Sequence, residues 1–208
     1  MKNNHHPYHT LRVILGDQLN AAHSWFHKPD QGVLYLIAEL HPEATYVKHH
    51  IQKLCAFFLA MEHFANALKS ANHQVCYLTL DETKNQRLET LILTLAAKHK
   101  VANIELQRPD EYRVIQQYRS LESNATKHRV RVVDSEHFLL PFDDISQHFK
   151  PQHSVRMENF YRKMRQRFNI LMDDDGQPEG GQWNYDSANR NKLKTKDLNA
   201  IPAPLCFQ

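Results

Sequence analysis

Short apolar runs alternate, as far as about residue 140, with segments whose apolar residues recur every three or four positions. The short runs predict strands at residues 11–15, 33–37, 75–80, 101–106 and 130–133. The longest periodic segment predicts a helix with one core-facing stripe of Val47, Ile51, Leu54, Phe58, Met61, Ala65 and Leu68. Pro109 is expected at the first position of another helix. Strands and helices that alternate in this way favour a parallel sheet with helices on both faces.

The alternation predicts a Rossmann-like, doubly wound α/β domain over residues 8–140. The pattern then changes, and residues 141–172 are expected to form a connecting loop followed by a basic amphipathic helix over 155–172, with Ser154 as its N-cap. Residues 173–208 are polar and have too few periodic apolar positions for a second core. We expect this last segment to be an interdomain linker, truncated before its partner domain.

The amino-acid composition excludes only a few classes of protein. The 208 residues are 41% hydrophobic and 24% charged, with a formal net charge of +3, which suits a soluble globular domain and does not by itself indicate nucleic-acid binding. The sequence shows neither a signal peptide nor an apolar run of membrane-spanning length. Its three cysteines are too dispersed for a zinc site or a disulfide framework. We therefore expect a cytoplasmic protein with no membrane partner and no metal site.

The candidate binding chemistry follows the first two predicted strands. Ligands bind parallel α/β sheets outside the carboxyl ends of the strands, where the turn Gly16-Asp17-Gln18 follows the first strand and Glu39 and Glu43 follow the second. Two interpretations are open for these acids. They cap helices or face water, or else Asp17 and Glu43 share a cleft and accept hydrogen bonds from a ring N–H or from hydroxyl groups.

Other enzyme classes receive little support. The sequence contains no Walker A motif, no GxGxxG after the first strand and no GxSxG. Their absence disfavours an independent nucleotide-using enzyme of the Rossmann type and a serine hydrolase.

The predicted helix 155–172 is basic, in contrast to the acidic residues at the strand ends. Basic residues flank its apolar stripe on both edges, with Arg162 and Arg165 on one of them. Such a helix is either an ordinary surface helix or a surface for phosphates, whose attraction weakens with salt. The alternative function is therefore a nucleic-acid-binding or scaffold module that uses Arg162 and Arg165.

Three blocks of sequence carry a family resemblance. They are ILGDQL at residues 14–19, EATYVKHH at 43–50, and MENFYRKMR at 157–165, the last followed by GGQWNYD at 180–186. In this order and spacing the chain resembles the deoxyribodipyrimidine photolyase-related family, the bacterial photolyases and cryptochromes that carry an iron–sulfur cluster. The blocks are specific together, and they span nearly the whole chain.

The resemblance implies an antenna domain with a flavodoxin-type sheet that binds 6,7-dimethyl-8-ribityllumazine. Asp17 and Glu43 match the acidic positions that bind this chromophore in the family, and Gly16 and Gln18, which flank Asp17, are expected to belong to the same binding site. Tyr46, nearly one helical turn after Glu43, is expected to line the same cleft. Ala38 is also expected in the pocket, at a position where some members have a cysteine.

The resemblance also implies what this chain lacks. In the family, FAD, the four cysteines of the 4Fe-4S cluster and the DNA-lesion surface belong to a carboxyl-terminal helical domain, of which this chain reaches only the first linker. We therefore expect a non-catalytic, chromophore-binding domain. DNA would be a partner of the full-length parent protein, in photorepair or in blue-light sensing.

Overall fold

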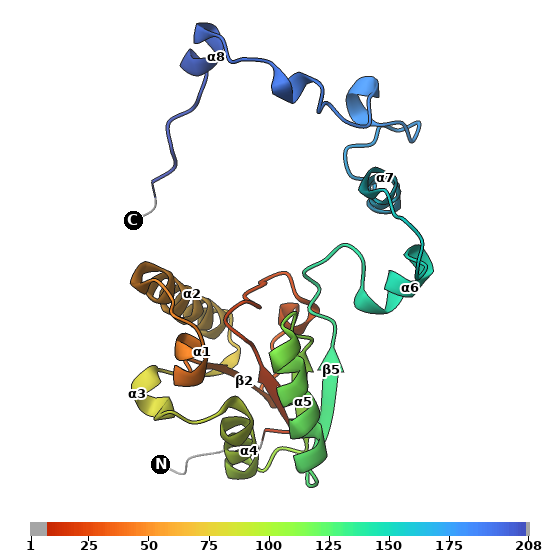
Figure 1. Cartoon of the computed structure of the whole chain (residues 1–208). Helices are drawn as coiled ribbons and strands as arrows, with labels where there is room; N and C mark the ends of the chain where they lie inside the picture. The colour runs from red at the N-terminus through yellow and green to blue at the C-terminus, as the bar shows by residue number, and fades with distance from the viewer. Residues whose placement is uncertain (1–7, 207–208) are drawn as a thin grey trace. The chain divides into compact units, whose positions relative to one another are not determined.

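The computed structural model describes residues 8–206 of the chain (Figure 1). They form two compact units, and the boundary between them in the sequence lies between Phe142 and Asp143. The part up to Phe142 is called unit 1 below, and the part from Asp143 onward is called unit 2. Among residues 8–206, every helix is too short or too polar to span a lipid bilayer.

Unit 1 is built on a parallel sheet of β1 (Thr10–Val13), β2 (Val33–Ala38), β3 (Gln74–Leu78), β4 (Asn103–Gln107) and β5 (Arg129–Val133). The prediction of a Rossmann-like α/β domain is confirmed. The strand order is β3-β2-β1-β4-β5, which is the Rossmann order. It differs from the flavodoxin order 2-1-3-4-5 that the family resemblance implied, because the chain crosses back over both β2 and β1 after β3 and pairs β4 with the far edge of β1.

The strand order places β1 at the centre of the sheet, with β2 on one side and β4 on the other. The chain therefore reverses its direction of winding between β1 and β4, and this is the topological switch point at which open α/β sheets bind ligands. Strand β2 is buried on both faces, with Tyr35, Leu36 and Ile37 fully inaccessible. This burial explains why β2 reads as a continuous apolar run instead of an alternating one.

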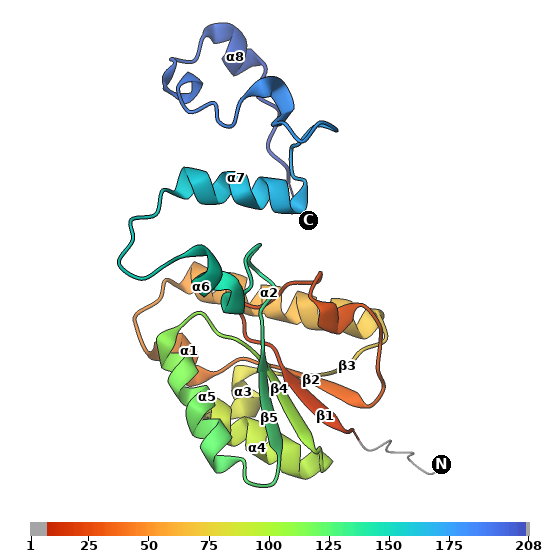
Figure 2. The same ribbon diagram turned by 90° about the vertical axis from the view of Figure 1, so that its right-hand side faces the viewer.

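Helices cover both faces of the sheet, as predicted. Helix α2 (Ile51–Ser70) packs against one face, through a cluster that includes Tyr35. Helices α4 (Leu88–His99) and α5 (Tyr112–Asn124) pack against the other face, through a cluster that includes Leu36. Figure 2 shows α2 on one side of the strands, and α4 and α5 on the opposite side.

Short helical turns lie in three of the connections between strands: η1 (Ser24–Phe26) after β1, α1 (His41–Thr45) after β2 and α3 (Leu80–Thr83) after β3. The stripe predicted for α2 is only partly correct. Val47 precedes the helix, and Val47 and Ile51 are 49% and 66% exposed. Burial on the sheet begins at Met61, because the first half of α2 flanks a cavity at the end of the strands instead of the sheet itself.

The predicted start of α5 is also corrected. Pro109 does not open the helix, which begins at Tyr112 with Glu111 as its N-cap. Pro109 is buried in the loop after β4 and contributes to the wall of the same cavity. This loop delivers Glu111 and the first turn of α5 to the carboxyl edge of the sheet.

Unit 2 consists of short helical segments: η2 (Phe142–Asp144) at its boundary, then α6 (Ile145–His148), α7 (Met157–Phe168), η3 (Glu179–Gly181), η4 (Ala188–Arg190) and α8 (Thr195–Asn199). Helix α7 is shorter than the predicted helix 155–172. Its N-cap is Arg156, not Ser154, and it ends before Asn169, whose left-handed backbone (φ 52°) stops the helix. The linker role expected for 173–208 stays a prediction.

Candidate functional site

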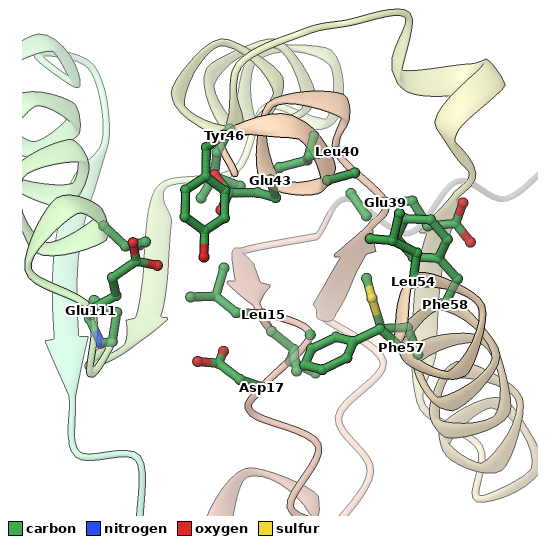
Figure 3. A pocket seen from close by; sticks show the side chains of 18 of the residues that line it. Leu15, Asp17, Glu39, Leu40, Glu43, Tyr46, Leu54, Phe57, Phe58 and Glu111 are labelled. Carbon is green, nitrogen blue, oxygen red and sulfur yellow. The ribbon is translucent and has the colours of Figure 1, made fainter. Parts of the chain in front are cut away.

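A cavity of about 210 Å³ lies at the carboxyl ends of β1 and β2, beside the switch point (Figure 3). All of its lining residues belong to unit 1. Figure 3 shows Leu54, Phe57 and Phe58 of α2 on one side of the cavity, and Tyr46 and Glu111 on the other. The lining is largely apolar and includes a few polar and charged groups, which is the usual make-up of a small-molecule site.

The structure brings most of the predicted binding residues to this one cavity. Gly16 and Asp17 reach it from the turn after β1, Ala38 from the end of β2, Glu43 from α1, and Tyr46 from the residue after α1. The predicted shared cleft for Asp17 and Glu43 is thus present as geometry. Whether these residues bind a chromophore stays a proposal.

Asp17 has a perturbed carboxyl group. The cavity wall removes part of its hydration, and this desolvation raises its pKa above the ordinary carboxyl value. The charge of nearby Asp110 acts in the same direction, while a hydrogen bond from the backbone of Asp17 itself and the proximity of His137 oppose it. A carboxyl group in this state favours a ligand that offers an N–H or O–H to it.

Glu43 is held by an arginine that the sequence analysis missed. Arg113 of α5 donates from Nη1 and Nη2 to the two Glu43 carboxylate oxygens, at 2.8 and 2.5 Å. It also donates to Glu111 from Nε and Nη2, at 2.9 and 3.0 Å. Its guanidinium lies over the ring of Tyr46, 4.5 Å from the ring centre. These hydrogen bonds raise the pKa of Arg113, so its charge is permanent.

Glu39, in contrast, has a structural role at the start of a helix, which is the first of the two interpretations that the sequence left open for these acids. Its carboxylate accepts hydrogen bonds from the Tyr77 hydroxyl and from the Leu80 backbone N–H at the start of α3. Burial, and then the bond to Glu39, raise the pKa of Tyr77. Figure 3 shows the Glu39 carboxylate turned away from the centre of the cavity. Glu39 therefore fastens β2 to the next βα connection.

Gln18 lies outside the cavity, contrary to the expectation from the resemblance. Its side chain is buried and donates from Nε2 to the carbonyl oxygens of Gln107 and Arg108, at 3.3 and 3.2 Å. Its Oε1 accepts from the Leu15 N–H at 3.1 Å. Gln18 therefore ties the turn after β1 to the end of β4 and shapes the cavity indirectly.

Gly16 is needed for the close approach of α2 to the turn after β1. A Cβ atom at this position would lie 2.9 Å from Met61 Sδ and 3.3 Å from Phe57 Cδ1. Both of these neighbours line the cavity. The absence of a side chain at residue 16 thus sets how far the α2 wall stands from the strands.

Tyr118 is a second residue that the sequence analysis did not assign to the site. It is 4% exposed, and its hydroxyl has no hydrogen-bond partner within the described residues. Burial raises its pKa most, and the charges of Asp17 and Glu43 add to that effect, which places the hydroxyl in the field of both carboxylates. Its position one turn after Val114, which lines the cavity, is the only signal for it in the sequence.

The two arginines named for the alternative function differ in their surroundings within unit 2. Arg165 is 6% exposed and donates to the backbone carbonyls of Ile170, Leu171 and Trp183. Arg162 forms an ion pair with Glu158 at 2.8 Å. Arg165 therefore stabilises the turn after α7, and this placement does not favour phosphate contact by the Arg162–Arg165 pair.

No group of three or more His, Cys, Asp or Glu side chains that could hold a metal ion occurs within residues 8–206. Cys55 and Cys206 are exposed, and Cys76 lies in β3. The cysteines described here therefore do not fit a four-cysteine iron–sulfur cluster.

Comparison with known proteins gives consistent results. Residues 12–208 match the family model described as deoxyribodipyrimidine photo-lyase-related protein. The chain is 32% identical over 188 residues to a (6-4) photolyase of Agrobacterium fabrum, an alignment that covers 88% of this chain and 36% of that protein. It is 23% identical over 194 residues to the uncharacterized protein R852 of Acanthamoeba polyphaga mimivirus, covering 89% of this chain and 96% of R852. The chain belongs to the deoxyribodipyrimidine photolyase-related family.

Proposed function

We propose that unit 1 binds a ribityllumazine-type chromophore, 6,7-dimethyl-8-ribityllumazine, and acts as the antenna domain of a photolyase- or cryptochrome-type flavoprotein. The observation that carries this proposal is that Asp17 and Glu43 both line the cavity at the switch point. Family membership makes a photolyase-related role the natural setting for such a site.

The lining suits a flat heterocycle with a polyol chain. Apolar and aromatic side chains of α2, including Leu54 and Phe57, offer contact area for a ring system. The carboxylates of Asp17 and Glu43 would accept hydrogen bonds from ring N–H or ribityl O–H groups.

The role of the whole protein is part of the same proposal. A bound lumazine absorbs near-ultraviolet or blue light and would pass the excitation energy to FAD. We propose that FAD and a 4Fe-4S cluster belong to a further domain of the parent protein, since this chain spans 36% of the length of the photolyase that it matches. DNA would be bound by that parent protein. Unit 1 would supply binding and orientation of the chromophore, without a catalytic residue of its own.

Titration of the purified chain with the lumazine, followed by fluorescence, tests the proposal. The variants Asp17→Asn and Glu43→Gln each remove the charge of one proposed hydrogen-bond acceptor, and Glu43→Gln also weakens the ion pair with Arg113. We expect roughly 10-fold to 100-fold weaker binding for each. Glu122→Gln, at an exposed position of α5, is the matched control and should bind like the wild type. Absence of binding to a wild-type chain whose circular dichroism shows it folded would refute the antenna role.

A further inference from the structure

Arg113 has almost no hydrogen-bonding capacity left. A guanidinium has five N–H donors, and four of those of Arg113 point to carboxylate oxygens of Glu43 and Glu111. One positive charge is thus shared by two negative ones. Arg113 contacts three residues that line the cavity, Glu43, Glu111 and Tyr46, but its guanidinium is not free to bind an anionic group of a ligand.

The charge of the remaining lining is also unfavourable for anions. Among the described residues that line the cavity, the acidic ones are Asp17, Glu39, Glu43 and Glu111, whereas Lys53 is the single lysine and there is no arginine. Lys53 lies on the α2 side, where its ammonium contacts His49 Nδ1 at 3.2 Å and lies 5.9 Å from the ring centre of Phe57. A phosphate at the Glu111 side would meet carboxylates with no available cation opposite it.

We propose that the clamp of Arg113 between Glu43 and Glu111 makes the cavity select a ligand with an uncharged ribityl chain and reject its 5′-phosphate. Glu111 is the specificity-determining residue. This inference rests on the proposed function, because it assigns a substrate preference to the same cavity.

Glu111 and Glu43 have different parts in this selection. Glu43 is expected to contact the ligand as well as Arg113, since a carboxylate has about four lone-pair sites. The Glu111 side chain is 44% exposed, and its carboxylate contacts Arg113 through Nε and Nη2. Neutralising Glu111 would release that edge of the guanidinium for a phosphate, and it would leave the Arg113–Glu43 pair in place.

The test compares 6,7-dimethyl-8-ribityllumazine with its 5′-phosphate, two ligands that differ only in the charged group. For the wild-type chain we expect the phosphate form to bind at least about 10-fold more weakly. In Glu111→Gln, the affinity for the phosphate form should rise by most of this difference of about 10-fold, because Arg113 is free to attract the phosphate. That affinity should then fall as salt is added. Binding of the unphosphorylated lumazine should change by less than about twofold.

Two controls separate the possible outcomes. Glu122→Gln should leave the ratio of the two affinities unchanged, and Lys53→Gln should not abolish binding of the phosphate form to Glu111→Gln. Equal affinity of the wild type for both forms would overturn the selection, as would tight, Lys53-dependent binding of the phosphate form. Failure of the folded chain to bind either form would overturn the antenna proposal itself, and this inference with it.

Discussion

At the scale of single residues, the acidic groups of this edge of the sheet divide into distinct roles. Glu39 is used by the fold, Glu43 is fixed by Arg113, and Asp17 keeps a partly desolvated carboxyl group that faces the cavity. The sequence could place these acids at the strand ends but could not separate their roles. The distinction depends on partners distant in the chain, such as Tyr77 and Arg113.

We therefore expect Asp17 to lower the stability of the protein in the absence of a ligand. Its pKa is raised in the folded state, so the ionised form is disfavoured there relative to the unfolded chain, where the value is near 3.8. At pH 7 we expect Asp17→Asn to raise the free energy of unfolding, by at most about 1 kcal/mol because the group is partly solvated.

This gain should disappear below the unfolded-state pKa of 3.8, where the wild-type carboxyl is protonated in both states. Denaturant unfolding of both proteins at about pH 3 and at about pH 7 measures the difference. A stability loss on substitution at pH 7 would show that Asp17 makes a favourable interaction in the empty cavity.

At the scale of elements, the first half of α2 decides the shape of the site. The five strands and the main helices could be predicted because buried strands and amphipathic helices have distinct apolar periods. The same periodicity placed Val47 and Ile51 in the core, although both are largely exposed and lie outside the cavity lining. It also placed Leu54 and Phe58 against the core, although both line the cavity. An apolar stripe shows that a helix face avoids water, but it does not distinguish a sheet surface from the wall of a ligand cavity.

Gly16→Ala tests this wall directly. The added methyl group would collide with Met61 and Phe57, so these two lining side chains would have to move and the cavity would change shape. We expect a loss of about 1–3 kcal/mol of stability, typical of overpacking, together with much weaker lumazine binding.

Thermal unfolding and fluorescence titration measure the two effects of Gly16→Ala separately. The double variant Gly16→Ala/Met61→Ala removes the nearer obstacle and should recover part of the binding. If Gly16→Ala binds the lumazine as well as the wild type does, the position of α2 does not set the width of the cavity.

At the scale of the whole molecule, the candidate site is confined to unit 1. Its lining runs from Val13 to Val114, and the boundary between the units lies after Phe142. The family blocks extend into unit 2, and the family match covers it as well. The second unit was harder to predict, because its helices are short and their ends depend on backbone conformations such as that of Asn169.

A chain that ends at Phe142 should therefore bind the lumazine within about twofold of the affinity of the full chain, since no lining residue is removed. Expression of residues 1–142 and the same fluorescence titration measure this affinity. A large loss of affinity in a folded unit 1 would mean that residues beyond 142 complete the site.

The central position of β1 has one more consequence. The cavity takes its walls from the connections of β1 and β2 on one side of the switch point, and from Leu88, Pro109 and Val114 on the other. Any molecule seated there adds contacts to both halves of the sheet at once. A bound ligand would therefore couple the two halves of the sheet. We expect them to unfold more cooperatively with ligand bound than in its absence.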